Sequence, residues 1–187
     1  MELWVLNPLS PPPRASTRRL NNMIDNQNLL DQFTNIISSK ILVTLEDLKI
    51  FKDGGIKIED FLNYLHKEKD YFFHGSGTLI PLNEKLSSKN GKLYATDDGG
   101  VAIIKALFAN NIPGMTNLGY SLNKNEDQKV VISGNPEGKF IREVGYVYIL
   151  KDVKGFSNEG TQGTVEFIRI LPNNEGQDYL CILEVEK

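Results

Sequence analysis

The sequence contains few of the residues on which several classes of binding site depend. Its 187 residues include one cysteine, Cys181, and two histidines, His66 and His74. One cysteine excludes an internal disulfide and every zinc motif that needs several cysteines. Cys181 lies among apolar residues, so we expect a buried structural sulfur. Two histidines without an HExxH spacing favour no metal site, and histidine-dependent chemistry would have to use one of the two.

Long apolar runs and an excess of positive charge are also absent. No stretch approaches the roughly 20 apolar residues of a membrane-spanning helix. The formal net charge is −3, which gives no electrostatic footprint for nucleic acid. Hydrophobic residues make up 40% of the chain and charged residues 24%, proportions typical of a globular protein. We therefore expect a soluble, cytoplasmic protein with one main domain that binds neither membranes nor nucleic acid.

The first 22 residues differ from the rest of the sequence. They contain the only tryptophan, Trp4, and half of the eight prolines, and after Arg19 the next arginine is Arg142. The apolar run that starts at Trp4 is too short for a signal peptide. Two interpretations stay open: a disordered proline-rich tail, or a vector-derived segment in front of a natural start at Met23. We favour the second, and in either case residues 1–22 do not enter the fold prediction.

Residues 23–70 are predicted to be helical. Apolar residues recur at helical spacing between Ile24 and Ile37. Thr44, followed by acidic residues, is typical of a capped helix start, and the run 53–55 (Asp-Gly-Gly) is predicted to end that helix. A further short helix is predicted over about 59–67. We interpret residues 23–70 as a helical cap packed on the rest of the chain.

From residue 71 onward the pattern changes to short β-type runs separated by Gly, Asn, Asp and Pro. A helix is predicted after Asp97, with its apolar residues between Val101 and Phe108. The sequence predicts loops over 110–128 and 155–163, and strands over 71–74, 93–96, 129–133, 144–150, 164–171 and 179–185. Many strands around one internal helix indicate an α+β fold with a largely antiparallel, split or sandwiched sheet.

His74 is the stronger functional candidate of the two histidines. It follows three aromatic residues and precedes Gly75-Ser76-Gly77. A histidine at a strand end beside glycines is well placed to bind a small polar molecule, because glycine lets a ligand reach the backbone. The alternative is a histidine whose ring is satisfied by a nearby carbonyl in a turn. His66 lies among charged residues, and we interpret it as a solvated histidine near a helix C-terminus.

Two motifs, in this order, resemble the ADP-ribosyltransferase superfamily. The first is Phe73-His74-Gly75-Ser76, and the second is Leu93-Tyr94-Ala95-Thr96-Asp97 with a helix directly after it. The pattern is most similar to the branch with a His–Tyr–Glu triad, to which the poly-ADP-ribose polymerases belong. The resemblance implies an ADP-ribosyltransferase-like α+β domain, with a split antiparallel β-sheet or sandwich, over residues 71–187. The helical cap would precede this domain.

The family carries its catalytic glutamate on a later strand, and four residues were weighed for this place. Glu166 is preferred because it lies early in the run 164–171, after a glycine-rich loop and before a proline. Glu143 comes too early in the order of elements. Glu184 and Glu186 alternate with apolar residues in the last strand, which is typical of outward charges. The alternative for Glu166 is an exposed strand carboxylate without a catalytic role.

The resemblance also implies how NAD, as a substrate, would bind. His74 would hydrogen-bond the adenine-side ribose, and the backbone of Gly75 would hold the nicotinamide carboxamide, with no side chain to obstruct the approach of the ligand. Ser76 and Thr96 would belong to the nucleotide-binding residues. Tyr94 would stack on the nicotinamide ring, since its flat face offers contact area with few rotors to freeze.

Glu166 would complete a catalytic triad with His74 and Tyr94. It would stabilise the oxocarbenium-like cation that forms as nicotinamide leaves. The implied activity is cleavage of the nicotinamide–ribose bond and transfer of ADP-ribose to an acceptor, expected to be a protein. Ala102 and Lys105 stand where the polymerase branch has a serine and a second tyrosine. The alternative function is therefore a catalytically degenerate module of the same fold that binds a nucleotide or a protein partner.

Overall fold

A computed structural model describes most of the helical part of the chain and the strands that pack on it. Its backbone is described over residues 15–87, 92–108, 120–124, 130–134, 141–151, 161–162, 165–166, 169–172 and 176–187. Side chains are described over residues 27–87, 93–108, 141–151 and 176–187. Within these ranges no helix has the length and hydrophobicity needed to cross a bilayer.

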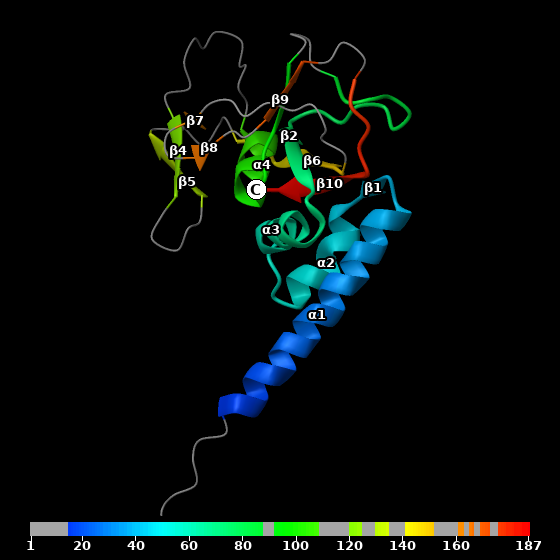
Figure 1. The fold of residues 1–187 in the computed structure, drawn as a ribbon, viewed down its shortest axis with the longest axis vertical. Helices are drawn as coiled ribbons and strands as arrows, with labels where there is room; N and C mark the ends of the chain where they lie inside the picture. The colour runs from blue at the N-terminus through cyan, green and yellow to red at the C-terminus, as the bar shows by residue number, and fades with distance from the viewer. Residues whose placement is uncertain are drawn as a thin grey trace, which may run out of the picture.

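A four-stranded mixed sheet forms the centre of the fold. Its spatial order is β1 (Leu42–Val43), β10 (Cys181–Glu186), β6 (Val144–Leu150) and β2 (Phe72–Ser76). β1 is parallel to β10, and the other two pairs are antiparallel. The predicted α+β class is therefore confirmed, with strands that are far apart in the sequence lying side by side (Figure 1).

Four helices share one core with this sheet. They are α1 (Ala15–Ser39), α2 (Leu45–Asp53), α3 (Ile58–Lys69) and α4 (Gly99–Leu107). Buried residues of all four helices form one apolar cluster with alternate sheet residues: Phe73, Val147, Ile149, Cys181, Leu183 and Val185. The sheet residues that point to the opposite face form a second apolar cluster: Phe72, Tyr148, Leu150 and Ile182. This cluster also contains Leu86, Leu93 and Ala95. This division follows from the alternation of side chains along a strand.

The segment 23–70 is a structural layer of this core. Phe33 of α1 and Phe51 of α2 are buried in the cluster that contains the sheet residues. In addition, β1 lies within this segment and pairs with β10, near the other end of the chain. The predicted cap is thus joined to the remaining chain by both packing and strand pairing.

The predicted start and end signals of α2 are confirmed, and α3 lies close to its predicted range. Thr44 forms a reciprocal capping box with Asp47, and α2 ends at Asp53. Gly55 follows with a positive φ of 75°, which glycine adopts without steric cost. α3 extends slightly beyond the predicted range, to Lys69, and Asp70 ends it in the left-handed conformation with φ 55°.

α1 begins earlier than the sequence prediction places it. The helix starts at Ala15, so residues 15–22 of the segment 1–22 are helical. Residues 1–14 lie outside the described residues. Alanine, arginine and leucine have high helix propensities, and the last proline of the segment, Pro13, precedes Ala15. The unusual composition of residues 1–22 is therefore a poor guide to where the helix starts.

Among the described residues, three further strand pairs lie outside the central sheet. β3 (Lys92–Ala95) pairs with β9 (Arg169–Pro172), β4 (Tyr120–Lys124) with β5 (Val130–Gly134), and β7 (Thr161–Gln162) with β8 (Val165–Glu166). Two predictions are corrected here. β4 lies within the segment 110–128, which the sequence predicted to be a loop. The prediction missed this strand because its alternating pattern is short and is surrounded by loop-type residues. The run 164–171 is divided between β8 and β9, since its parts pair with different strands.

Phe33 anchors α1 on the other helices. Its ring centroid lies 4.3 Å from that of Phe51 and 3.7 Å from that of Phe61. We predict that Phe33→Ala lowers the free energy of unfolding by about 3–5 kcal/mol, because it leaves a cavity among rigid helices. Urea denaturation measures this change. Ile50→Ala, on the exposed side of α2, is the control and should change it by less than about 1 kcal/mol. Equal losses would contradict the placement of α1 in the core.

Candidate functional site

The candidate site lies where β2 and β3 meet and then separate. The N–H of Phe73 donates to the carbonyl oxygen of Thr96 at 2.8 Å, and the N–H of Thr96 donates to that of Phe73 at 2.9 Å. β3 then leaves the central sheet and pairs with β9. Backbone groups point to alternate sides along a strand, so the N–H and C=O of Gly75 face the same edge as those of Phe73. Within the described part of the chain, neither group of Gly75 has a backbone partner across this split.

The side chain of His74 occupies the place of the missing backbone pair. Its Nδ1 lies 2.6 Å from the carbonyl oxygen of Tyr94. If the ladder continued beyond Phe73 and Thr96, this carbonyl would accept from Gly75, two residues further along β2. The imidazole takes this bond at the point where the two strands separate. One of the two interpretations of His74 was a histidine whose ring hydrogen-bonds a nearby carbonyl. Such a hydrogen bond is present at Nδ1.

This hydrogen bond fixes the tautomer of His74. A carbonyl oxygen can only accept, so Nδ1 carries the proton and donates it. Burial lowers the pKa of His74 below its ordinary value of 6.5, although the bond to Tyr94 opposes this change. The ring is consequently neutral at pH 7, and Nε2 carries a lone pair that can accept a hydrogen bond.

Tyr94 is a half-exposed residue of β3, next to the split. Its two strand neighbours, Leu93 and Ala95, are buried in the second cluster, whereas Tyr94 is 50% exposed. The alternation of β3 therefore turns the ring outward, where a flat ligand can stack on it. The structure brings the backbone of Tyr94 into contact with His74, which the sequence had placed in the same site.

Gly75 is required by packing as well as by its position at the edge. A β carbon at this residue would overlap the carbonyl oxygen of Ala102 and lie 2.7 Å from the backbone nitrogen of Ala106. Both are backbone atoms of α4, so they cannot move aside cheaply. The sequence interpretation attributed the glycine to the approach of a ligand, whereas the structure attributes it to the close packing of α4 on β2.

Ser76 and Thr96 have local structural partners that the sequence did not indicate. The hydroxyl of Ser76 donates to the carbonyl oxygen of Thr78 at 3.0 Å and accepts from its N–H at 3.1 Å. The hydroxyl of Thr96 accepts from the N–H of Asp98, the N-cap of α4, at 3.1 Å. Thr96 is also buried, which argues against a direct contact with a nucleotide.

Glu166 lies in β8, opposite Thr161 of β7. Its side chain lies outside the described residues, and β8 is not part of the strand pair that carries Tyr94.

The two glutamates of β10 that were weighed for the same role have partners on α2. Glu184 accepts from the N–H of Leu45, the first residue of α2, at 3.1 Å, and Glu186 accepts from Nζ of Lys52 at 2.6 Å. Both acids thus stabilise the contact between α2 and β10.

The chain matches no protein-family model, no curated protein and no solved structure. We therefore base the function on the residues around the split between β2 and β3.

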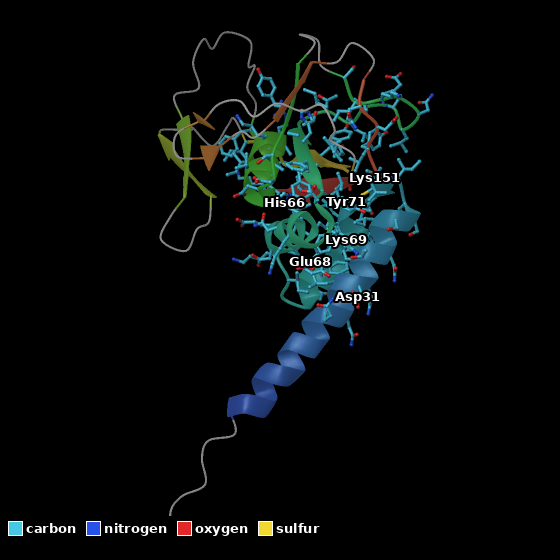
Figure 2. The ribbon with its side chains drawn as sticks, in the orientation of Figure 1. Asp31, His66, Glu68, Lys69, Tyr71 and Lys151 are labelled. Atoms are coloured by element: carbon cyan, nitrogen blue, oxygen red, sulfur yellow. The ribbon has the colours of Figure 1, made fainter. Side chains whose placement is uncertain are left out.

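His66 was interpreted as a solvated histidine near a helix C-terminus, and it does lie in the last turn of α3. Its ring is half-buried, with Nδ1 3.0 Å from the carbonyl oxygen of Tyr71 and Nε2 3.9 Å from the carboxylate of Asp97. The left-handed Asp70 ends α3 directly before Tyr71, and Figure 2 labels His66 and Tyr71 in this region. His66 therefore joins the end of α3 to the strands that carry the candidate site.

Cys181 is buried in the sheet, and burial raises the pKa of its thiol to about 12. The thiol is therefore protonated at neutral pH and is a poor nucleophile, which confirms its structural role. In the same part of the chain that the structure describes, no three His, Cys, Asp or Glu side chains lie close enough to hold a metal ion.

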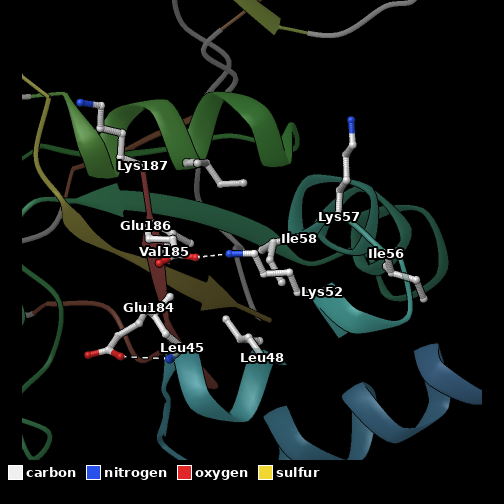
Figure 3. Close-up of a pocket in the computed structure, with 12 residues that line it drawn as sticks. Leu45, Leu48, Lys52, Ile56, Lys57, Ile58, Glu184, Val185, Glu186 and Lys187 are labelled. Atoms are coloured by element: carbon white, nitrogen blue, oxygen red, sulfur yellow. Dashed lines mark hydrogen bonds and ion pairs between the residues drawn. The ribbon is translucent and has the colours of Figure 1, made fainter. Parts of the chain in front are cut away.

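A separate pocket of about 730 Å³ lies between α2, the start of α3 and the end of β10 (Figure 3). Its wall is mainly apolar and includes Leu48, Ile58 and Ile103. The ion pair between Lys52 and Glu186 spans one side of it. None of the predicted site residues lines this pocket, so it is distinct from the split beside His74.

The lowered pKa of His74 makes folding sensitive to pH. Below the ordinary histidine pKa, the unfolded chain takes up a proton at residue 74 that the folded protein does not accept. The stability that His74 contributes is therefore present above about pH 6.5 and is lost as pH falls through the folded pKa. We predict that the wild type loses more unfolding free energy than His74→Asn between about pH 7 and about pH 5. Urea denaturation at each pH measures the difference.

His74→Asn is the matched variant, because its amide can donate to the carbonyl of Tyr94 but does not titrate. Histidine NMR provides the second readout, since the chain has only two such rings. The signal lost in His74→Asn should titrate below pH 6.5 and show a protonated Nδ1. Identical pH dependence of the two proteins, or a protonated Nε2 in the neutral ring, would contradict this geometry.

Proposed function

We propose that this chain is an NAD-dependent enzyme similar to ADP-ribosyltransferases, in which the split between β2 and β3 is the nicotinamide site. The observation that carries the proposal is the hydrogen bond from His74 to the carbonyl of Tyr94. It joins the imidazole to the backbone of Tyr94 beside the open backbone of Gly75, and the ring of Tyr94 is half exposed. The divergence of β3 from the central sheet is also what a split-sheet fold of this superfamily requires.

The open edge of Gly75 is complementary to a carboxamide. The amide group of nicotinamide has a donor NH₂ and an acceptor oxygen, which match the C=O and N–H of one strand residue. The ring of Tyr94 supplies a stacking surface beside that edge. Together they would orient nicotinamide by hydrogen bonds and by stacking.

His74 is suited to a ribose hydroxyl. Its Nδ1 proton is directed to Tyr94, so Nε2 acts only as an acceptor while the ring is neutral. A hydroxyl can donate to that nitrogen and still accept from other groups. The lowered pKa of His74 keeps this acceptor available at neutral pH.

The proposed reaction breaks the bond between the nicotinamide nitrogen and the ribose carbon. The bonding electrons neutralise the pyridinium ring, and the positive charge develops on the ribose. Glu166 is proposed to stabilise this charge, mainly in the transition state. The nucleophile of an acceptor, proposed to be a protein, then bonds to the ribose carbon and releases its proton. Attack by water would instead give free ADP-ribose.

The second candidate is a binding module without turnover. It is favoured by α4, where Ala102 is fully buried beneath Gly75 and offers no hydroxyl to a ligand. Lys105 lies beside the same glycine in place of an aromatic ring, and burial lowers the pKa of its amine. Such a module would bind a nucleotide or a protein partner on the same edge without cleaving NAD.

Release of nicotinamide from labelled NAD distinguishes the two candidates. We predict release by the wild type and a loss of about 100-fold or more in Glu166→Gln, because the charge on the ribose would lose its stabilising carboxylate. Glu143→Gln removes an exposed carboxylate outside the site and is the control. Equal release by wild type and Glu166→Gln would refute the role of Glu166. A thermal shift with NAD but no release would support the binding module.

The stacking role of Tyr94 is tested separately through binding. We predict that Tyr94→Ala weakens NAD binding roughly 10-fold, because a half-exposed ring contributes contact area to a ligand. The same change should alter stability by less than about 1 kcal/mol. Isothermal titration calorimetry gives the affinity, and Tyr94→Phe, which keeps the ring, should bind as the wild type does. Unchanged affinity in Tyr94→Ala would remove this residue from the site.

A further inference from the structure

Arg142 lies against the glycine-rich end of β2. A β carbon at Gly77 would lie within 2.6 Å of Nη1 of Arg142 and would also overlap Cζ and Nε. The guanidinium therefore occupies the space that any side chain at residue 77 would need. Glycine at this position leaves room for the cation directly beside the strand that carries His74 and Gly75, and a larger residue would displace the flexible guanidinium.

The backbone of Arg142 is anchored to α4. Its N–H donates to the carbonyl oxygen of Leu107, the last residue of α4, at 2.7 Å. The preceding residue, Ile141, pairs with Phe108 directly after the helix. Arg142 is thus attached to the end of the helix that packs on Gly75, so its position relative to the split is fixed by regular structure.

Arg142 is half-buried as a residue, and its guanidinium has no ion-pair partner in the described part of the chain. None of the ion pairs found among the described residues includes Arg142. Removing a charge from water without a partner costs free energy, which an anion at this place would recover. A guanidinium offers a planar fork of donors that binds two oxygens of a phosphate at once. Its surroundings therefore suit a phosphate group.

The residue type at this position supports the same conclusion. The chain uses lysine for most of its cations, and after Arg19 its only arginines are Arg142 and Arg169.

A second cation lies near the same strand. Lys105, on α4, has its β carbon 2.9 Å from the position of a β carbon on Gly75, and its side chain is half-buried. Two cations, Lys105 and Arg142, therefore flank the short stretch from Gly75 to Gly77.

We propose that Arg142, lying against Gly77, is the anchor for the diphosphate of a dinucleotide whose nicotinamide is held at Gly75. The inference rests on the proposed function for the identity of the ligand. The geometry is consistent with it, because two residues of extended chain span roughly 7 Å. This is of the order of the single sugar that separates nicotinamide from the diphosphate. Nicotinamide would then bind at the split, and the diphosphate would bind at the end of β2.

The test compares ligands that carry the two groups separately. Calorimetry measures the binding of ADP-ribose, inorganic diphosphate and free nicotinamide to the wild type and to Arg142→Gln. We predict that Arg142→Gln weakens ADP-ribose and diphosphate binding roughly 10- to 100-fold, because a charge-assisted bidentate contact is lost. Nicotinamide binding should stay within about twofold, since its contacts are at Gly75 and Tyr94.

Three variants separate a specific contact from general electrostatics and from unfolding. Lys151→Gln removes one positive charge at the opposite end of β6 and should bind ADP-ribose as the wild type does (Figure 2). Arg142→Lys keeps the charge without the fork and should bind with intermediate affinity. Gly77→Ala keeps Arg142 but displaces its flexible tip, so it should weaken ADP-ribose binding about as much as Arg142→Gln while leaving the melting temperature nearly unchanged.

The outcomes separate this inference from the proposed function. Diphosphate binding that depends on Arg142, in a protein that releases no nicotinamide from NAD, would support the anion site and reject the transferase. NAD cleavage with full ADP-ribose affinity in Arg142→Gln would overturn the inference and leave the proposed function intact. Equal losses in Arg142→Gln and Lys151→Gln, or no binding of ADP-ribose and diphosphate by the wild type, would also overturn it.

Discussion

The hydrogen bond from Nδ1 of His74 to the carbonyl oxygen of Tyr94 determines which donors and acceptors are open at the edge between β2 and β3. It occupies the carbonyl that would otherwise pair with Gly75, so the backbone groups of Gly75 face the split without a backbone partner from β3. It also sets the tautomer of His74, because the accepting carbonyl requires a proton on Nδ1. One contact thus produces a backbone donor and acceptor, together with an imidazole acceptor, along a single edge.

The second constraint is the close packing of α4 on the sheet. A β carbon at Gly145 would lie 2.6 Å from the backbone carbon of Ala106, and one at Gly75 would overlap Ala102. The two glycines lie on neighbouring strands, β6 and β2, and let the helix backbone rest directly on both. Because α4 is held so closely, Lys105 lies beside the split and the end of the helix binds Arg142. Sites built on regular elements keep their geometry better than sites built on loops.

Local signals predicted those parts of the fold that depend on neighbouring residues. The capping box at Thr44, the stop after Asp53 and the whole of β6 were visible in short patterns. The order of residues around His74 and Tyr94 likewise placed both in one candidate site. By contrast, the division of the run 164–171 between two partners depends on long-range pairing, which periodicity does not encode.

The remaining parts of the site depend on tertiary contacts. The partners of His66 come from Tyr71 and Asp97, which pack together only once α3 and β3 are in place. Likewise, Gly77 and Arg142 are far apart in the sequence and lie together only through the pairing of β2 with β6. Thr96 was predicted from its motif to bind the nucleotide, whereas its hydroxyl accepts a hydrogen bond from the N–H of Asp98 at the start of α4.

The most direct test of the split is its response to a ligand that carries only the carboxamide and the ring. Nicotinamide can be titrated into ¹⁵N-labelled protein while backbone amide shifts are recorded. If the edge of β2 is the nicotinamide site, the amide of Gly75 shifts saturably and the histidine signal of residue 74 moves with it. Shifts confined to the pocket near Leu48 and Ile103, or no saturable shift at Gly75, would contradict the site.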